Sequence, residues 1–384
     1  MSDTRKTTKP NVPNLRFPRF EGEWELKKLS AYLYENKERN RNGEFNKSDV
    51  LSVSGDCGIV NQIELLGRSF AGKSVADYHV VRTDDIVYTK SPLKEYPYGI
   101  VKYNNGQDGI VSTLYAVYHH KDNVDGQFVE YYFTNPQRTN RYFKPIVRIG
   151  AKHDMKIGNE EVLDSFVVFP GLEEQRKITE MLSLLDLRIA IQNKVIEKYE
   201  SLIKALRHHL FSTLESVKEV PVADLLSYEQ PTKYIVSDTE YSNNTDLTPV
   251  LTANKAFILG YTDEVEGIYD KGPCIILDDF TLDFKIVEFP FKVKSSAIKI
   301  LSAKTTVSLR YIFEYLKFLD LNTEEHKRHY IAEIEPMSIE LPEEDTIKSI
   351  AFLFDLMDKR RKGLERDQQL LKSQKDYLLR EIFI

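Results

Sequence analysis

The chain has 384 residues, of which 41% are hydrophobic and 29% charged, and its formal net charge is −6 at pH 7. This length exceeds one ordinary hydrophobic core, so we expect two domains with connecting elements. The acidity argues against a protein that coats nucleic acid, and no apolar run predicts a membrane span or a secretory signal.

The two cysteines, Cys57 and Cys274, lie far apart and outside any CxxC pattern. This usage fits a reducing cytoplasm and a chain without a disulfide framework. Cys274 lies in the apolar run PCIILDD, where we expect it to be a small core residue.

The first predicted elements are a flexible tail at 1–14 and a mixed α+β domain at 15–168. Runs of Val, Ile, Tyr and Phe in this domain are separated by Gly, Asn and Asp, which favour turns.

The octapeptide GRSFAGKS at 67–74 matches the phosphate-binding pattern GxxxxGK[ST]. Nucleotide binding by this pattern needs a helix that starts at the lysine, because the helix amides and dipole hold the phosphates. The residues after Lys73 instead predict two strands, YHVV and DIVY, joined by a turn. We interpret the octapeptide as a basic surface loop in which Arg68 and Lys73 are candidate phosphate contacts.

Basic residues also gather in the second half of this domain. Six of them stand between positions 137 and 156 against one acid, Asp154: Arg138, Arg141, Lys144, Arg148, Lys152 and Lys156. Such a local patch suits DNA phosphates even in an acidic chain. The candidate DNA contacts of the first domain are therefore Lys90 and Lys94, in the loop after IVYT, with Arg138, Arg141, Lys144 and Arg148. The alternative for each is an ordinary solvated charge.

A long helix is predicted over 169–215. Its apolar residues recur in alternating steps of four and three, which is a heptad seam. The seam consists of Ile178, Leu182, Leu185, Ile189, Ile196, Tyr199, Ile203 and Leu206, with Gln192 as a polar member. A helix over 178–210 is about 50 Å long, which exceeds what one small domain can cover.

A second mixed α+β domain is predicted over 216–340, and it echoes the first. VLTANKAFILGYTD from Val250 parallels VLSVSGDCGIVNQ from Val50. The candidate DNA contacts here are Asn254 and Lys255, in the turn after VLTA, with Lys292 and Lys294 beside FPF, because amides can read adenine and cations meet phosphates or guanine.

Three catalytic patterns are weak. The acids of DDFTLDFK at 278–285 share one hairpin loop, so no second strand completes a metal-held carboxylate pair. His326 and His329 have the spacing of metal ligands on one helix but no further ligands nearby. TNPQR at 134–138 lacks the second proline and the aromatic residue of an adenine methyltransferase motif.

A second long helix is predicted over 341–384, and it repeats the first. Pro342 minus Pro170 gives an offset of 172, under which FPGLEEQRKITEMLSLLDLR aligns with LPEEDTIKSIAFLFDLMDKR without a gap. Each helix follows a strand-like piece and opens with an acidic turn, which complements the helix dipole. The second seam consists of Ile350, Phe354, Met357, Leu364, Leu371 and Leu378, interrupted by Arg361, Gln368 and Lys375.

The sequence therefore predicts an α+β fold with two pseudo-symmetric mixed α/β domains separated by two long antiparallel coiled-coil helices. We expect the domains to lie at the ends of the helix pair. The polar residues in the second seam either weaken the coiled coil or mark a surface for a partner, and we favour the partner surface.

Four phrases resemble the specificity subunits of bacterial type I restriction-modification enzymes. They are LRFPRFEGEWELKKLSAYL, FAGKSVADYHVVRTDDIVYTKSPLKEYPYGIV, GIVSTLYAVY and PGLEEQRKITEMLSLLDLRIAIQNK. The resemblance covers essentially the whole chain. It is specific as a combination, although each phrase alone is weak.

The resemblance implies a non-catalytic subunit whose two target-recognition domains each read half of a bipartite, asymmetric sequence in double-stranded DNA. It further implies that the helices dock two methyltransferase subunits and that restriction (motor) subunits join the complex. S-adenosylmethionine, ATP and Mg²⁺ then belong to those partners, and this chain needs no cofactor or metal. Because recognition domains vary across the family, no base-reading residue is carried over by motif.

Two other functions remain as alternatives. One is a coiled-coil scaffold that joins two protein-binding domains without DNA recognition. The other is an ATP-hydrolysing enzyme built on the octapeptide at 67–74.

Overall fold

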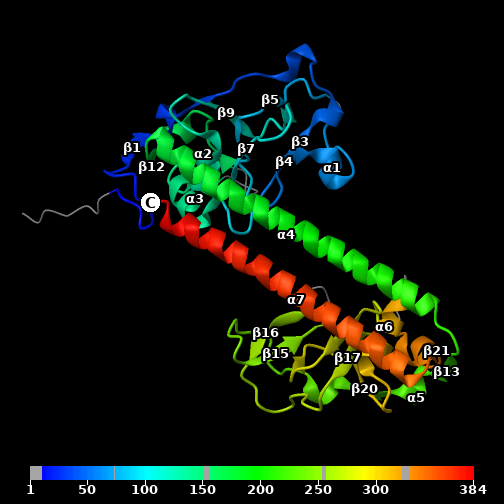
Figure 1. The fold of residues 1–384 in the computed structure, drawn as a ribbon. Helices are drawn as coiled ribbons and strands as arrows, with labels where there is room; N and C mark the ends of the chain where they lie inside the picture. Colours follow the sequence, from blue (N-terminus) through cyan, green and yellow to red (C-terminus); the bar gives the residue numbers. More distant parts are fainter. Residues whose placement is uncertain (1–10, 73, 150–154, 253–256, 322–327) are drawn as a thin grey trace, which may run out of the picture. The chain divides into compact units, whose positions relative to one another are not determined.

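The computed structural model describes residues 11–72, 74–149, 155–252, 257–321 and 328–384. The chain forms two compact units (Figure 1). Unit 1 comprises Met1–Ile191 and Gln368–Ile384, and unit 2 comprises Gln192–Asp367. The described helices include none with the length and apolar character of a membrane span. The domain boundaries drawn from the sequence stay predictions.

Unit 1 contains one β-rich domain. Its strands are β1 (Glu25–Lys28), β2 (Leu33–Glu35), β3 (Leu51–Ser54), β4 (Gly58–Asn61), β5 (His79–Val81), β6 (Ile86–Tyr88), β7 (Val101–Tyr103), β8 (Gly109–Val111), β9 (Ala116–His120), β10 (Arg148–Ile149), β11 (Met155–Lys156) and β12 (Phe166–Phe169). Its helices are α1 (Gln62–Leu66), α2 (Gly126–Thr134) and α3 (Pro136–Phe143).

The central sheet of this domain has the order β2-β9-β6-β7, and every pairing in it is antiparallel. Helix α2 follows β9 and begins where the Asp125 side chain accepts a hydrogen bond from the Phe128 amide. Phe128 and Phe133 of α2 are fully or almost fully buried in the core of the domain. The last strand, β12, pairs with β1 and leads directly into the first long helix.

Unit 2 contains a second β-rich domain. Its strands are β13 (Lys218–Pro221), β14 (Leu226–Glu229), β15 (Thr248–Leu251), β16 (Ile258–Thr262), β17 (Cys274–Asp278), β18 (Phe284–Val287), β19 (Lys292–Val293), β20 (Ile298–Ala303) and β21 (Ser338–Leu341). Its helices are α5 (Val222–Leu225), α6 (Leu309–Phe318) and a π-helical turn, η7 (Tyr330–Ile334).

The second domain repeats the connectivity of the first. Its central sheet has the order β14-β20-β17-β18, again antiparallel throughout, and α6 follows β20 as α2 follows β9. Strand β21 pairs with β13 before the second long helix, as β12 pairs with β1 before the first. The internal repeat seen in the helices therefore extends through both domains.

The two domains also differ. Unit 1 inserts α3 and the short β10–β11 pair between its domain helix and its last strand, where unit 2 has η7. Cys274 is fully buried in β17, as the apolar run predicts, and burial raises the pKa of its thiol to about 12.

The long helices are α4 (Leu172–Ser212) and α7 (Glu344–Glu381), and each contributes to both units. In unit 1, Ile178 and Leu182 at the start of α4 share a buried core with Leu379 at the end of α7 and with Ile382 just after it. In unit 2, the end of α4 packs on the start of α7, and Leu206 lies against the core that contains Phe354. Within each unit the helices are antiparallel, so the predicted fold class is confirmed.

The predicted seam residues of α4 are buried or half-buried along the whole helix, whereas Leu184, Leu187 and Ile191 between them are exposed. Gln192 donates to the Leu364 carbonyl oxygen at 2.8 Å, so the polar seam position in α4 has a partner on α7.

Polar residues in the second seam also have partners. Lys375 forms an ion pair with Asp186 of α4 and lies 5.6 Å from the centre of the Tyr131 ring. Arg361 pairs with Asp358 and Glu365 on its own helix, at 2.7 and 2.6 Å. Lys375 and Arg361 therefore have partners within the chain, and the surface for a partner protein at these seam positions stays a prediction.

Candidate nucleic-acid interface

Helix α3 carries the densest group of predicted DNA contacts, and its residues divide into buried and exposed sides. Asn135 caps the helix by accepting from the Arg138 amide, and Pro136 occupies the first turn, which suits its fixed backbone angle. Arg138, Thr139, Tyr142 and Phe143 face the core, whereas Arg141 is exposed.

Arg138 is a structural residue, contrary to its selection as a DNA contact. Its side chain is buried, and its guanidinium donates to the carbonyl oxygens of Tyr132, Leu379, Phe383 and Ile384 at 2.9 to 3.3 Å. It also lies over the rings of Tyr132 and Phe383. Burial lowers the pKa of Arg138 to about 10. These contacts use four of the five guanidinium N–H donors and fasten residues 379–384 to the domain of unit 1, so the buried side chain is not placed to meet a phosphate.

The exposed cations of this region are Arg141, Lys144, Arg148 and Lys94. Asn140 donates to the Glu95 carbonyl oxygen at 3.1 Å, which joins α3 to the loop that carries Lys94. Among the residues that the structure describes, none pairs these four cations with an acid. They are therefore available to meet phosphates.

Lys90 is less available than these cations. It is half-buried, and its ammonium donates to the Ile157 carbonyl oxygen at 3.0 Å and to the side chain of Asn159. Burial lowers the pKa of Lys90. We infer that Lys90 fixes its own loop against the segment that follows β11.

Arg68 lies in a second exposed place of unit 1, just beyond α1. Its guanidinium stacks on the Phe70 ring at 4.5 Å from the ring centre, and Phe70 is 58% exposed. Exposed aromatic rings beside arginine can stack on the unpaired bases of single-stranded nucleic acid. Phe70 is not among the contacts predicted from the sequence, because the octapeptide matches a phosphate-binding pattern in which the cations alone carry the chemistry. The position of an aromatic residue between Arg68 and Lys73 was the feature of the sequence that could have identified Phe70 as a candidate.

The predicted contacts of unit 1 therefore form two groups. Helix α1 packs on β3 and β4, whereas α3 packs on α2, and Figure 1 shows α1 and α3 well apart. Lys73, a further predicted contact, falls outside the described residues. Helix α1 ends at Leu66, just before the octapeptide, and residues 74–78 are not helical. The helix that nucleotide binding requires after Lys73 does not form there.

In unit 2, Lys292 is buried and pairs with Glu264 at 2.7 Å, while also donating to the Glu266 carbonyl oxygen at 2.6 Å. The Lys292 ammonium holds the pKa of Glu264 below its ordinary value. This lysine is engaged inside the domain, which argues against its selection as a DNA contact. Lys294 is exposed, and Asn254 and Lys255 lie outside the described residues.

The acids of the hairpin after β17 have structural partners. Asp278 accepts from the Phe280 amide at 2.8 Å, which closes the turn. Asp279 is buried, accepts from the Tyr330 amide at 2.8 Å and lies 3.3 Å from the Lys299 ammonium. His329 is buried and its Nδ1 lies 2.8 Å from Glu333. The described part of the chain contains no group of three or more His, Cys, Asp or Glu residues placed to hold a metal ion.

No protein-family model matches the sequence. Over 132 residues the chain is 43% identical to the specificity subunit of the type I restriction enzyme EcoR124I/EcoR124II of Escherichia coli. This match covers 33% of the chain and spans about a third, 32%, of that relative.

Solved structures match over nearly the whole chain. The crystal structure of a type I restriction-modification S subunit from M. genitalium matches with a TM-score of 0.60 and 13% identity, covering 97% of this chain and 99% of the other. A structure described under complex assembly and conformational transition of the type I R-M system matches with a TM-score of 0.51 and 13% identity, covering 94% and 96%. The chain has the fold of these proteins, and the resemblance drawn from the sequence phrases is confirmed.

Proposed function

We propose that this chain is the DNA-specificity subunit of a type I restriction-modification complex. In this proposal each β-rich domain reads one half of a bipartite, asymmetric DNA sequence. The long helices dock the methyltransferase subunits, and the restriction subunits join the same complex. Methyl transfer from S-adenosylmethionine and ATP- and Mg²⁺-dependent cleavage belong to those partners, so we assign this chain no catalytic residue.

The observation that carries the proposal is the duplication. The two domains share one connectivity, and in each a strand pair leads into a long helix. This repetition supports two DNA-recognition domains of the same construction. A single chain with two similar DNA-binding domains suits a target made of two unlike halves, because each domain can diverge in its own loops. The 43% identity to an E. coli specificity subunit supports the type I assignment.

The contacts divide by chemistry. We assign Lys94, Arg141, Lys144 and Arg148 to the DNA backbone, because solvated cations on a folded surface position a protein on the duplex without reading its sequence. We assign Arg68 with Phe70 in unit 1 and Lys294 in unit 2 as further contacts. Asn254 and Lys255 stay candidates for base reading.

Sequencing of modified bases tests the proposal. Cells that carry this chain with a matching methyltransferase should show methylated adenine in one motif split by unread bases. Methylation without a motif, or none at all, would count against it. DNA footprinting of the assembled complex distinguishes this proposal from the coiled-coil scaffold. A specificity subunit should protect a site in two parts, whereas a scaffold without DNA recognition should protect none.

A further inference from the structure

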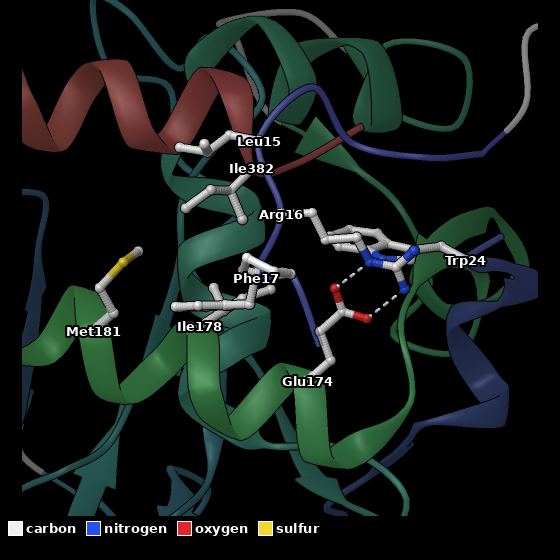
Figure 2. A pocket seen from close by; sticks show the side chains of 9 residues that line it. Leu15, Arg16, Phe17, Trp24, Glu174, Ile178, Met181 and Ile382 are labelled. Carbon is white, nitrogen blue, oxygen red and sulfur yellow. Dashed lines mark hydrogen bonds and ion pairs between the residues drawn. The ribbon is translucent and has the colours of Figure 1, made fainter. Parts of the chain in front are cut away.

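Unit 1 has an apolar pocket of about 180 Å³ where the start of α4 meets the end of α7. Ile178 and Met181 of α4 and Ile382 after α7 form its helical walls (Figure 2). Trp24, which precedes β1, closes one side and is buried.

The segment Leu15–Pro18 covers this pocket, and we call residues 11–23 the arm. The Leu15 amide donates to the Glu381 carbonyl oxygen at 2.9 Å. The Arg16 guanidinium forms a two-bond ion pair with Glu174, at 2.8 and 2.7 Å, as Figure 2 shows. Phe17 packs against the core. The arm thus binds the groove with two apolar side chains and one cation between them.

Unit 2 has a groove at the equivalent place. Under the offset of 172, Ile178, Met181 and Glu174 correspond to Ile350, Leu353 and Thr346, and Ile382 corresponds to Leu210. All four equivalents line one groove of about 450 Å³, together with Leu214, Thr213, Ser349 and Asp345. The duplication has therefore produced the groove twice.

Unit 2 lacks an equivalent of the arm in the described part of the chain. The chain enters this domain from the end of α4 at Ser212, and only residues 213–217 precede β13. Leu210, Leu214 and Leu353 are left half-buried, and the groove is larger than the pocket that the arm covers in unit 1.

We propose that the groove of unit 2 binds an extended segment of a partner protein with the chemistry of the arm. That segment places two apolar side chains against Ile350, Leu353 and Leu210, with a cation between them. Among the described residues that line the groove, Asp345 is the only charged one, so it provides the counter-charge that Glu174 provides in unit 1. Apolar grooves that take extended or helical segments are a recurrent mode of peptide recognition.

The occupant comes from another protein rather than from this chain. The chain's own arm is held in unit 1 by the ion pair to Glu174 and the backbone bond to Glu381. The proposal concerns protein binding, so it stands or falls separately from DNA recognition.

The arm itself supplies the probe. A synthetic peptide of residues 11–20, NVPNLRFPRF, with a fluorescent label is titrated with the full chain, and its anisotropy is followed. We expect saturable binding that weakens at least tenfold in Leu353→Glu. Ser349→Trp, at an exposed position that lines the groove, should block the groove to the same degree. A peptide with Leu15→Glu and Phe17→Glu should not bind.

The matched control is Met181→Glu, the equivalent of Leu353→Glu in unit 1. Leu356→Glu, at an exposed position of α7 outside the groove, should leave peptide binding within twofold, whereas Met181→Glu tests whether the peptide replaces the arm. Absence of saturable binding overturns the proposal, as does binding that is lost in Met181→Glu but kept in Leu353→Glu, since the peptide would then be replacing the arm. Self-association of the chain that disappears in Ser349→Trp would assign the groove to a second copy and also overturn it.

Discussion

Two arginines one helical turn apart show how burial decides what a charged residue does. Arg138 is 9% exposed and donates to four carbonyl oxygens, whereas Arg141 is exposed and has no acidic partner among the described residues. A buried guanidinium is costly unless it is hydrogen-bonded, and its burial keeps it away from DNA phosphates. Of two arginines in one basic patch, Arg138 is therefore held inside the domain, whereas Arg141 stays a proposed DNA contact.

Arg138→Ala should destabilise the chain by about 2–4 kcal/mol, because it leaves buried carbonyl oxygens without donors. Arg138→Lys should recover little, since an ammonium cannot reproduce the planar fork. Trp24 is the only tryptophan and lies in unit 1, so its fluorescence during urea unfolding reports this change. Arg141→Ala is the control and should change stability by less than about 0.5 kcal/mol. Equal effects of the two alanines would contradict the assignment.

The exposed cations should govern DNA affinity and its salt dependence. Replacing Arg141, Lys144 and Arg148 together by alanine should lower affinity of the assembled complex for DNA of any sequence. The slope of log K against log salt should fall by about 0.9 for each phosphate that the protein no longer neutralises. A matched triple of exposed lysines outside the long helices, at Lys27, Lys47 and Lys271, removes the same charge. If both triples change the slope alike, net charge rather than the α3 surface is responsible.

At the scale of elements, the long helices obtain their stability from one narrow stripe. The seam side chains are buried or half-buried, while residues beside them are open to solvent. Leu182 is fully buried and Leu184, two positions later, is 59% exposed. A two-residue step moves a side chain to the opposite face of a helix, so neighbouring leucines have unequal weight.

Leu182→Ala should cost about 2–5 kcal/mol, the range for a buried leucine whose cavity does not collapse. Leu184→Ala should cost less than about 0.5 kcal/mol, because alanine is the better helix former and little burial is lost. Urea unfolding of the two variants under identical conditions provides the comparison. A large loss in Leu184→Ala would show that the exposed face is covered in solution.

The elements also show what sequence could predict. The heptad pattern and the ungapped repeat predicted two long helices that pack on each other, because a heptad seam is a pattern of local spacing. The burial of Arg138 and Lys292 was not predictable in this way. Their partners, such as Leu379 and Glu264, lie far away in the sequence or are backbone oxygens, which carry no sequence signal. Phe70 is visible in the sequence, but it lies inside a pattern that points to phosphate binding rather than to stacking.

At the scale of the whole molecule, the duplication is the central feature. The sequence repeat predicts that each domain is followed by a long helix. The sheet connectivity of the two domains repeats in the same way. We predict that the domains lie at the ends of a helical spacer and reach two half-sites on one duplex. The length of the spacer should then set the number of unread bases between the half-sites.

Inserting seven residues into α4 keeps the seam in phase, because the seam repeats every seven residues. It also lengthens the helix by about 10 Å, at about 1.5 Å per residue. That length corresponds to about three base pairs at about 3.4 Å each. The methylated motif should keep both half-sites and gain unread bases between them. A change in the half-site bases would contradict the spacer role.

Replacement of one domain is the most direct test that each domain recognises its own half-site independently. Residues 216–336 are exchanged for the corresponding segment of another specificity subunit, and the methylated motif of the hybrid is determined in cells with its methyltransferase. The account predicts that one half-site changes to that of the donor while the other half-site stays as it was. A hybrid whose two half-sites both change, or whose motif is that of the parent chain, would contradict it.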